Sequence, residues 1–190
     1  MKLEYKELKA SLWKDVEKLF GPNGGCAGCW CIWWRLPKGG KLWQETRGAK
    51  AKKLFQGLVK KGQARGVLAY ADGVPVGWAT FGPRTDFPRL ETAKAYAVED
   101  FGTVWSLPCF FIQSGFRSKG IARGLLAAVI KSAKKHKAKI LEGYPVPLTK
   151  AGKKLPAGFS WTGPLKIFEE AGFKIVQRQS YSRPLVRKNL

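Results

Sequence analysis

The chain has 190 residues, of which 35 are Lys or Arg and 13 are Asp or Glu, so its formal net charge is +22. A hydrophobic content of 45% and eight Trp exclude a disordered chain, and no apolar run is long enough to span a membrane. The N-terminal segment carries scattered carboxylates, unlike a signal peptide, so we expect one cytoplasmic domain over residues 1–190, a monomer or homodimer without a membrane partner. The excess of Lys and Arg indicates either a surface that is simply solvated by water or a surface that binds a polyanionic partner such as nucleic acid or the ribosome.

Two segments of the N-terminal part have the spacing of amphipathic helices. Apolar residues recur at helical spacing in residues 3–20, and a stretch rich in Gly follows at 21–25. Residues 42–61 repeat this pattern around Phe55, with lysines on the remaining face. Those lysines indicate a solvated face or, alternatively, a contact with nucleic acid.

A loop rich in Cys and Trp, residues 21–36, separates the two predicted helices. Its cysteines are Cys26, Cys29 and Cys31. Zinc prefers four tetrahedral ligands, and the fourth would have to be the distant Cys109 or His136. Because Cys29 and Cys31 are also separated by only one residue, we predict no metal site and free thiols in a reducing compartment.

The tryptophans of this loop allow two interpretations. Clustered aromatic residues usually pack in a core, but the glycines around them favour a special backbone path, which suits a wall of a substrate pocket. The candidates for contact with an acceptor are Trp30, Trp33 and Trp34 of the loop, together with Trp78 further along the chain.

Residues 66–82 predict a β-hairpin, because Asp72 and Gly73 separate two apolar runs and Gly accepts the positive φ of such a turn. Residues 85–103 are polar and mixed in composition, so we expect a connection there, with room for a short helix.

The next stretch passes from an apolar strand through a polar turn into a helix. Residues 104–112 are rich in aromatic and β-branched side chains, and apolar residues recur at helical spacing from Ile121 to Ala133. Between them, Gly120 places unpaired N–H groups at the start of the helix, where the helix dipole also favours anions. The junction therefore predicts a phosphate-binding site.

The C-terminal part continues the alternation of strands and helices. We expect a strand at 139–146, a basic loop at 147–159, a helix at 161–171 and a last strand that starts at Phe173.

Residues 117–122 form an Arg-x-x-Gly-x-Ala pattern, which resembles the acetyl-coenzyme A signature of the GNAT superfamily of N-acetyltransferases. The hairpin before this pattern and the elements after it follow the order of GNAT proteins. Phe168 to Phe173 also resembles the Tyr-x-x-x-Gly-Phe segment that closes GNAT domains.

This resemblance implies a mixed α/β (α+β) fold with a mainly antiparallel sheet and helices on both faces. One strand would separate from its neighbour to admit the pantetheine arm of acetyl-CoA, while the turn at Gly120 would bind the pyrophosphate. The residues that the resemblance assigns to acetyl-CoA are Phe110, Phe111, Ile112, Arg117, Ser118, Lys119, Gly120, Ile121, Ala122 and Arg123.

The implied reaction is direct attack of a neutral amine on the acetyl thioester. It needs a base, an N–H near the developing oxyanion and a proton for the departing thiolate. Glu142 is the candidate base, because it lies on the strand beside the cofactor cleft and shares a face with Tyr144. The usual proton-donating tyrosine aligns with Phe168, so Tyr144, or else Ser160 or Thr162, would replace it.

The sequence thus predicts an acetyl-CoA-dependent N-acetyltransferase that acts on a primary amine of a small molecule or peptide. The alternative is a basic, RNA- or ribosome-associated protein of the same fold, which either acetylates an RNA-linked or ribosomal amine or has lost catalysis. Cys109 is expected to pack in the core, although a thiol on this strand also suits a covalent acyl intermediate.

Overall fold

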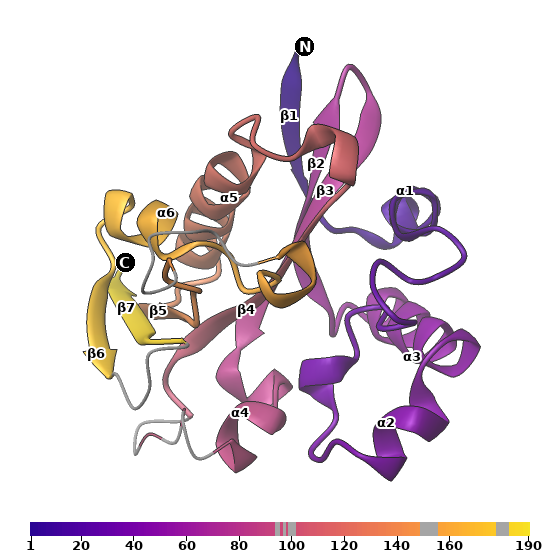
Figure 1. The fold of residues 1–190 in the computed structure, drawn as a ribbon, viewed down its shortest axis with the longest axis horizontal. Coiled ribbons are helices and arrows are strands. Elements are labelled where there is room, and N and C mark those ends of the chain that lie inside the picture. The colour runs from indigo at the N-terminus through magenta and orange to yellow at the C-terminus, as the bar shows by residue number, and fades with distance from the viewer. Residues whose placement is uncertain (94–95, 97, 99–101, 149–155, 178–182) are drawn as a thin grey trace.

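A seven-stranded sheet with helices on both faces forms the described part of the chain, in a computed structural model that covers residues 1–93, 96, 98, 102–148, 156–177 and 183–190 (Figure 1). The strands are β1 (Leu3–Glu7), β2 (Arg65–Ala71), β3 (Val74–Pro83), β4 (Trp105–Ile112), β5 (Ile140–Gly143), β6 (Lys174–Gln177) and β7 (Leu185–Asn189). The α-helices are α1 (Trp13–Phe20), α2 (Lys41–Thr46), α3 (Ala49–Lys60), α4 (Arg89–Thr92), α5 (Ile121–Lys135) and α6 (Leu165–Glu170).

The strand order is β1-β2-β3-β4-β5-β7-β6, and every neighbouring pair is antiparallel except β4 and β5. The α5 helix connects these two parallel strands, as a crossover between parallel strands requires. The mixed, mainly antiparallel sheet that the sequence predicted is therefore confirmed.

Three apolar clusters hold the helices on the sheet. On one face α5 and α6 pack against the strands, and Val129 and Phe168 are fully buried there. On the other face α1 and α3 cover β2 and β3 around Trp78. A third cluster joins α4 to Tyr144, just beyond β5, on the same side as α1 and α3 (Figure 1).

A β-bulge shapes β4 where it leaves β5. Between the pairs Gly82–Ser106 and Thr80–Cys109, β4 has one residue more than β3, so the strand bends at Leu107 and Pro108. Pairing of β4 with β5 also ends at Leu107. Pro108 has no N–H to give to a neighbouring strand, which agrees with the end of pairing at this point.

The first predicted helix was wrong at its start. Residues 3–7 form the edge strand β1, with Leu3 and Tyr5 packed against the core under α5 and Lys6 exposed. The Leu, Glu and Lys content favours a helix locally, but pairing with β2 decides the structure, because strand preference depends on tertiary contacts.

Other boundaries also differ from the predictions. The helix predicted over 42–61 is broken at Gly48 into α2 and α3, and β7 was not anticipated. The helix expected at 161–171 is shorter, because it starts only at Leu165, after Pro164. The predicted loop at 147–159 lies mostly outside the described residues.

The packing of β1 against α5 can be tested at two helical glycines. A Cβ at Gly124 would collide with the ring of Tyr5, whereas no atom lies within 4 Å of the Cβ position at Gly57 of α3. Gly124→Ala should therefore lower the free energy of unfolding by about 1–3 kcal/mol through overpacking, while Gly57→Ala should raise it by about 1 kcal/mol. Denaturant titration of both variants measures this, and equal stabilisation by the two would contradict the packing of Tyr5 on α5.

Candidate active site

Pairing between β4 and β5 ends after three residue pairs, and this break in the sheet, the β4–β5 cleft, is filled by residues 160–165. Successive peptide groups in a strand point to opposite edges, so Phe110 and Ile112 direct their N–H and C=O groups into this cleft, whereas Phe111 faces β3. The hydrogen bond from the Gln113 N–H to the Val76 carbonyl confirms this alternation. Phe110 and Ile112, two of the predicted cofactor residues, thus form the edge of β4 that pairs with no strand among the described residues.

Residues 160–165 cross this cleft. The carbonyl of Trp161 accepts a hydrogen bond of 2.5 Å from the Phe110 N–H. On the other side, the Val146 N–H donates to the Gly163 carbonyl and the Leu165 N–H donates to the Val146 carbonyl. The segment therefore bridges β4 and the continuation of β5. Its Trp161 carbonyl occupies the N–H of Phe110, a residue that was expected to contact acetyl-CoA.

The turn before α5 has the geometry of an anion site. Gly120 lies in the left-handed region with φ 78°, and no side chain caps the helix that it precedes. No acidic residue lies in the first turn of α5, and the space around the Cβ position of Gly120 is open within 4 Å. The first N–H groups of a 15-residue helix are thus available to a phosphate, and the residues present fit the pyrophosphate of coenzyme A.

The predicted basic side chains lie around this turn, although each also has a contact within the protein. The Arg117 Nε donates to the Ile112 carbonyl at 3.1 Å, and Lys119 lies over the ring of Phe116. Arg123 is exposed and forms a bidentate ion pair with Glu170.

The remaining predicted residues of the turn contribute mainly through their backbone. Ile121 is 1% exposed and packs in the core under α5, so only its N–H faces the turn. Ser118 has a positive φ of 60°, which indicates a tight turn, and Ala122 is half-buried behind it.

Glu142, the predicted base, lies at the centre of a buried polar cluster. Its Oε1 accepts hydrogen bonds from Arg84, Tyr144 and, at 3.1 Å, Ser106. Its Oε2 accepts one from the Nε of Arg187 at 3.1 Å. Glu142 is fully buried, so an amine could reach it only if this cluster opened.

The cluster also weakens the case for Glu142 as a base. A carboxylate that accepts several hydrogen bonds, two of them from guanidinium groups, is stabilised in its charged form and accepts a further proton poorly. The role of Glu142 in proton removal stays a prediction, and the observed contacts support a structural role.

Tyr144, the predicted acid, belongs to the same cluster. Its hydroxyl lies 3.0 Å from the Ser106 Oγ and 3.3 Å from Arg84, and burial raises its pKa above the usual value. The ring is stacked near Trp34 and lies 4.7 Å from the ring of Tyr96. Proton transfer from Tyr144 to a thiolate therefore also stays a prediction that requires movement of the cluster.

The four predicted acceptor tryptophans do not form one wall. Trp30 and Trp78 are 2% and 0% exposed in the core under α1 and α3, so neither indole can contact an acceptor in this arrangement. Trp33 packs against Trp43 and under Arg89. Trp34 lies beside Tyr144, and its buried Nε1 has no hydrogen-bond partner among the described residues.

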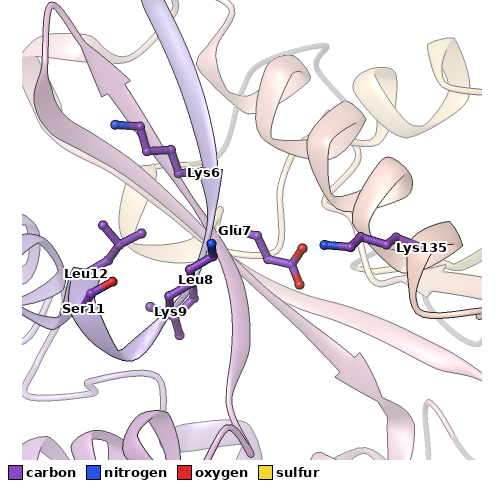
Figure 2. A pocket seen from close by; sticks show the side chains of 7 residues that line it. All are labelled: Lys6, Glu7, Leu8, Lys9, Ser11, Leu12 and Lys135. Carbon is purple, nitrogen blue, oxygen red and sulfur yellow. The ribbon is translucent and has the colours of Figure 1, made fainter.

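A separate pocket of about 480 Å³ lies where β1 leads into α1, close to the C-terminal end of α5 (Figure 2). It is lined by Lys6, Glu7, Leu8, Lys9, Ser11, Leu12 and Lys135. The Glu7 carboxylate points toward Lys135 and also pairs with His136 at 2.5 Å. This pocket is at the opposite end of α5 from Gly120, so it is distinct from the predicted cofactor turn.

The described residues contain no group of three His, Cys, Asp or Glu side chains placed to hold a metal ion. They also include no helix that is long and apolar enough to cross a membrane.

A family model described as the acetyltransferase (GNAT) family matches residues 29–144, more than half of the chain. The chain belongs to the GNAT acetyltransferase family. This confirms the family that the sequence resembled, and residues 29–144 include β4, the Gly120 turn and Glu142 with Arg84, Ser106 and Tyr144.

Solved structures agree with this assignment at the level of the fold. A PaiA N-acetyltransferase from Thermoplasma acidophilum, in complex with coenzyme A, is 14% identical with a TM-score of 0.55, over 100% of both chains. An N-acetyltransferase from Staphylococcus aureus Mu50 is 13% identical with a TM-score of 0.57, over 100% of this chain and 98% of that one. The yncA protein from Salmonella typhimurium, with its cofactor acetyl-CoA, is 10% identical with a TM-score of 0.54, over 100% of this chain and 95% of that one.

No curated protein sequence matches the chain significantly. The structural neighbours that contain coenzyme A or acetyl-CoA agree with acetyl-CoA as the cofactor of this GNAT fold.

Sequence reasoning missed the partners of Glu142, namely Arg84, Ser106 and Arg187. Arg84 is fully buried although it follows the hairpin in a Gly-Pro-Arg turn that reads as exposed loop. A charged side chain in a turn gives no sequence signal of burial, because its partner lies 58 residues away.

The Glu142 cluster can be tested by removing one charge. Glu142→Gln should lower the free energy of unfolding by about 3–5 kcal/mol, because it leaves buried guanidinium groups without their carboxylate. Glu45→Gln, which alters an exposed pair with Lys41, should change it by less than about 0.5 kcal/mol. Urea unfolding measures both, and a Glu142 variant as stable as the Glu45 control would contradict the structural role.

Proposed function

We propose that this GNAT chain transfers an acetyl group from acetyl-CoA to a primary amine of a small molecule or peptide. The observation that carries the proposal is the turn at Gly120, which presents uncapped helix N–H groups and whose Arg117 contacts the carbonyl of Ile112 on the strand-free edge of β4. The turn would bind the pyrophosphate and the edge of β4 would bind the pantetheine arm. When bound, acetyl-CoA supplies the activated acetyl group.

The backbone of β4 provides a donor for the charge that develops on the acetyl oxygen. The Phe110 N–H points into the cleft and is the donor that Trp161 holds. A fixed N–H at this place would stabilise an oxyanion once the Trp161 carbonyl moves away. Trp34, with its buried and unpartnered indole N–H beside Tyr144, is the tryptophan best placed to contact an acceptor near the cluster.

A second partner class is supported by charge. The net charge of +22 and the pocket with Lys6, Lys9 and Lys135 favour a polyanion such as RNA, as the sequence analysis expected.

We also propose that residues 1–190 act as one cytoplasmic domain, as a monomer or homodimer.

The cofactor site can be tested with two glycines of matched conformation. Gly120 and Gly62 both have positive φ, 78° and 68°, and open space around the Cβ position. Acetyl-CoA at about 100 times its Kd should stabilise the wild-type chain by about 2.7 kcal/mol. Gly120→Glu should abolish the shift in Tm, because it places a carboxylate in the phosphate site, whereas Gly62→Glu should keep it.

This comparison separates binding from strain. Both substitutions impose the same backbone cost, so a difference between them reports the phosphate site alone. Loss of the shift in both variants, or no shift in the wild type, would contradict the proposed function.

The position of Trp161 predicts a change on binding. The pantetheine arm requires the edge of β4, so residues 161–165 should lose their bonds across the cleft when acetyl-CoA binds. Hydrogen exchange at the Val146 and Leu165 amides, which donate across the cleft, should become faster with acetyl-CoA, while the Phe110 amide stays protected by its new partner. Unchanged exchange at Val146 and Leu165 under saturating acetyl-CoA would show that the arm does not take this path.

A further inference from the structure

One segment of the chain fills the place that the proposed function gives to the pantetheine arm. This segment, the strap, comprises residues 156–165 and crosses from β4 to the continuation of β5. Its Trp161 carbonyl accepts the hydrogen bond of 2.5 Å from Phe110, and its Gly163 carbonyl accepts one of 2.8 Å from Val146. A Cβ at Gly163 would lie 3.0 Å from the Phe110 ring, so the strap packs closely on the residue whose N–H it takes. The strap therefore has to move before a cofactor can pair with this part of β4.

Arg183 ties the strap to the neighbouring part of the sheet. Its Nη2 donates a hydrogen bond of 2.8 Å to the Phe159 carbonyl. Its guanidinium also lies over the ring of Trp161, 4.4 Å from the ring centre. A charge-assisted hydrogen bond and a cation–π contact both stabilise the arrangement in which they form. Arg183 thus stabilises the strap in the position that it has across the cleft.

The backbone of Arg183 is itself fixed. The next residue, Pro184, restricts Arg183 to extended backbone conformations, and β7 starts directly after it. Leu185 and Val186 of β7 are each 1% exposed, and β7 pairs with both β5 and β6. The guanidinium therefore reaches the strap from an anchored point of the sheet.

The closed strap also carries a cost. The Thr162 side chain is fully buried, and its hydroxyl has no hydrogen-bond partner among the described residues. The buried Nε of Arg183 likewise has no partner in the part of the chain that the structure describes. Buried polar groups without partners cost free energy. The contacts of Arg183 thus hold the strap closed against an opposing term, which suits a segment that exchanges between two positions.

We propose that Arg183 is a latch that holds the strap in the β4–β5 cleft and thereby lowers the affinity of the chain for coenzyme A and its thioesters. The inference rests on the proposed function, because it requires the pantetheine arm to pair with the edge of β4. Binding needs the open strap, so the apparent Kd equals the intrinsic Kd divided by the open fraction. A change that raises the open fraction should therefore tighten binding.

The experiment is calorimetric titration of the full chain with coenzyme A. Arg183→Ala removes both contacts with the strap, so its Kd should be about tenfold lower than that of the wild type. The direction of the change is informative, because the loss of a cation near an anionic cofactor would otherwise weaken binding. An unchanged or higher Kd would overturn the latch.

A second variant acts from the side of the strap. Trp161→Leu keeps an apolar side chain but removes the ring beneath Arg183. Its Kd should fall by about threefold, because only the cation–π contact is lost. This variant leaves Arg183 and its charge in place, so it tests the latch even if Arg183→Ala does not fold.

Arg89 offers a matched control. Its guanidinium lies 3.9 Å from the centre of the Trp33 ring, and its Nε donates to the Trp33 carbonyl at 2.7 Å. These contacts are of the same two kinds, but they involve the loop at 21–36 instead of the strap. Arg89→Ala should therefore leave the Kd for coenzyme A unchanged, and an equal fall in all three variants would count against the latch.

Hydrogen exchange without cofactor supplies a readout that general destabilisation would not reproduce. The Val146 and Leu165 amides donate across the cleft and exchange when the strap opens. Arg183→Ala should speed their exchange by the same factor by which it lowers the Kd, because both quantities depend on the open fraction. The amides of the β2–β3 hairpin should keep their wild-type rates, and faster exchange of the strap without tighter binding would overturn the latch.

The titrations also separate the two levels of inference. If the wild type binds coenzyme A and neither Arg183→Ala nor Trp161→Leu binds it more tightly, the latch is wrong and the proposed function stands. If none of these chains binds coenzyme A, the proposed function is contradicted and the latch with it.

Discussion

The carboxylate of Glu142 is the constraint on which the cleft depends. It joins Arg84 after β3, Ser106 on β4, Tyr144 after β5 and Arg187 on β7, so four segments meet at the middle one of the three β4–β5 residue pairs. A buried ion pair of this kind adds little net stability compared with apolar packing, but breaking it is costly. Its consequence is therefore geometric, because it holds these segments together one residue before the pairing of β4 and β5 ends.

The two strands separate just beyond this fixed point. The bulge at Leu107 and Pro108 turns β4 away, and the peptide groups of Phe110 and Ile112 then lack a neighbouring strand on that side among the described residues. Buried peptide groups without partners cost free energy, so another chain segment or a ligand must satisfy them. The Trp161 carbonyl meets this need for Phe110, which makes segment 160–165 and a cofactor arm alternative partners for the same edge.

Local sequence patterns predicted the parts of the site that local chemistry determines. The Asp72–Gly73 hairpin, the strand before Arg117 and the helix after Gly120 all follow from turn residues and periodicity. The ion cluster could not be found this way, because Arg84 and Glu142 are 58 residues apart and neither position has a pattern typical of burial. The edge strand β1 failed for a similar reason, since its Leu, Glu and Lys residues favour a helix until β2 is present.

Trp30 of the 21–36 loop packs in the core, which is one of the two interpretations that the sequence left open for the tryptophans of this loop. Burial of a Trp side chain removes roughly 150–250 Å² from water, about 4–6 kcal/mol at 25 cal/mol per Å². Trp30 is 2% exposed against Trp13 and Phe20, so its packing can offset the strain of two positive φ angles at about 1–3 kcal/mol each. Its aromatic contacts thus stabilise the strained turn of the loop at Trp30 and Cys31.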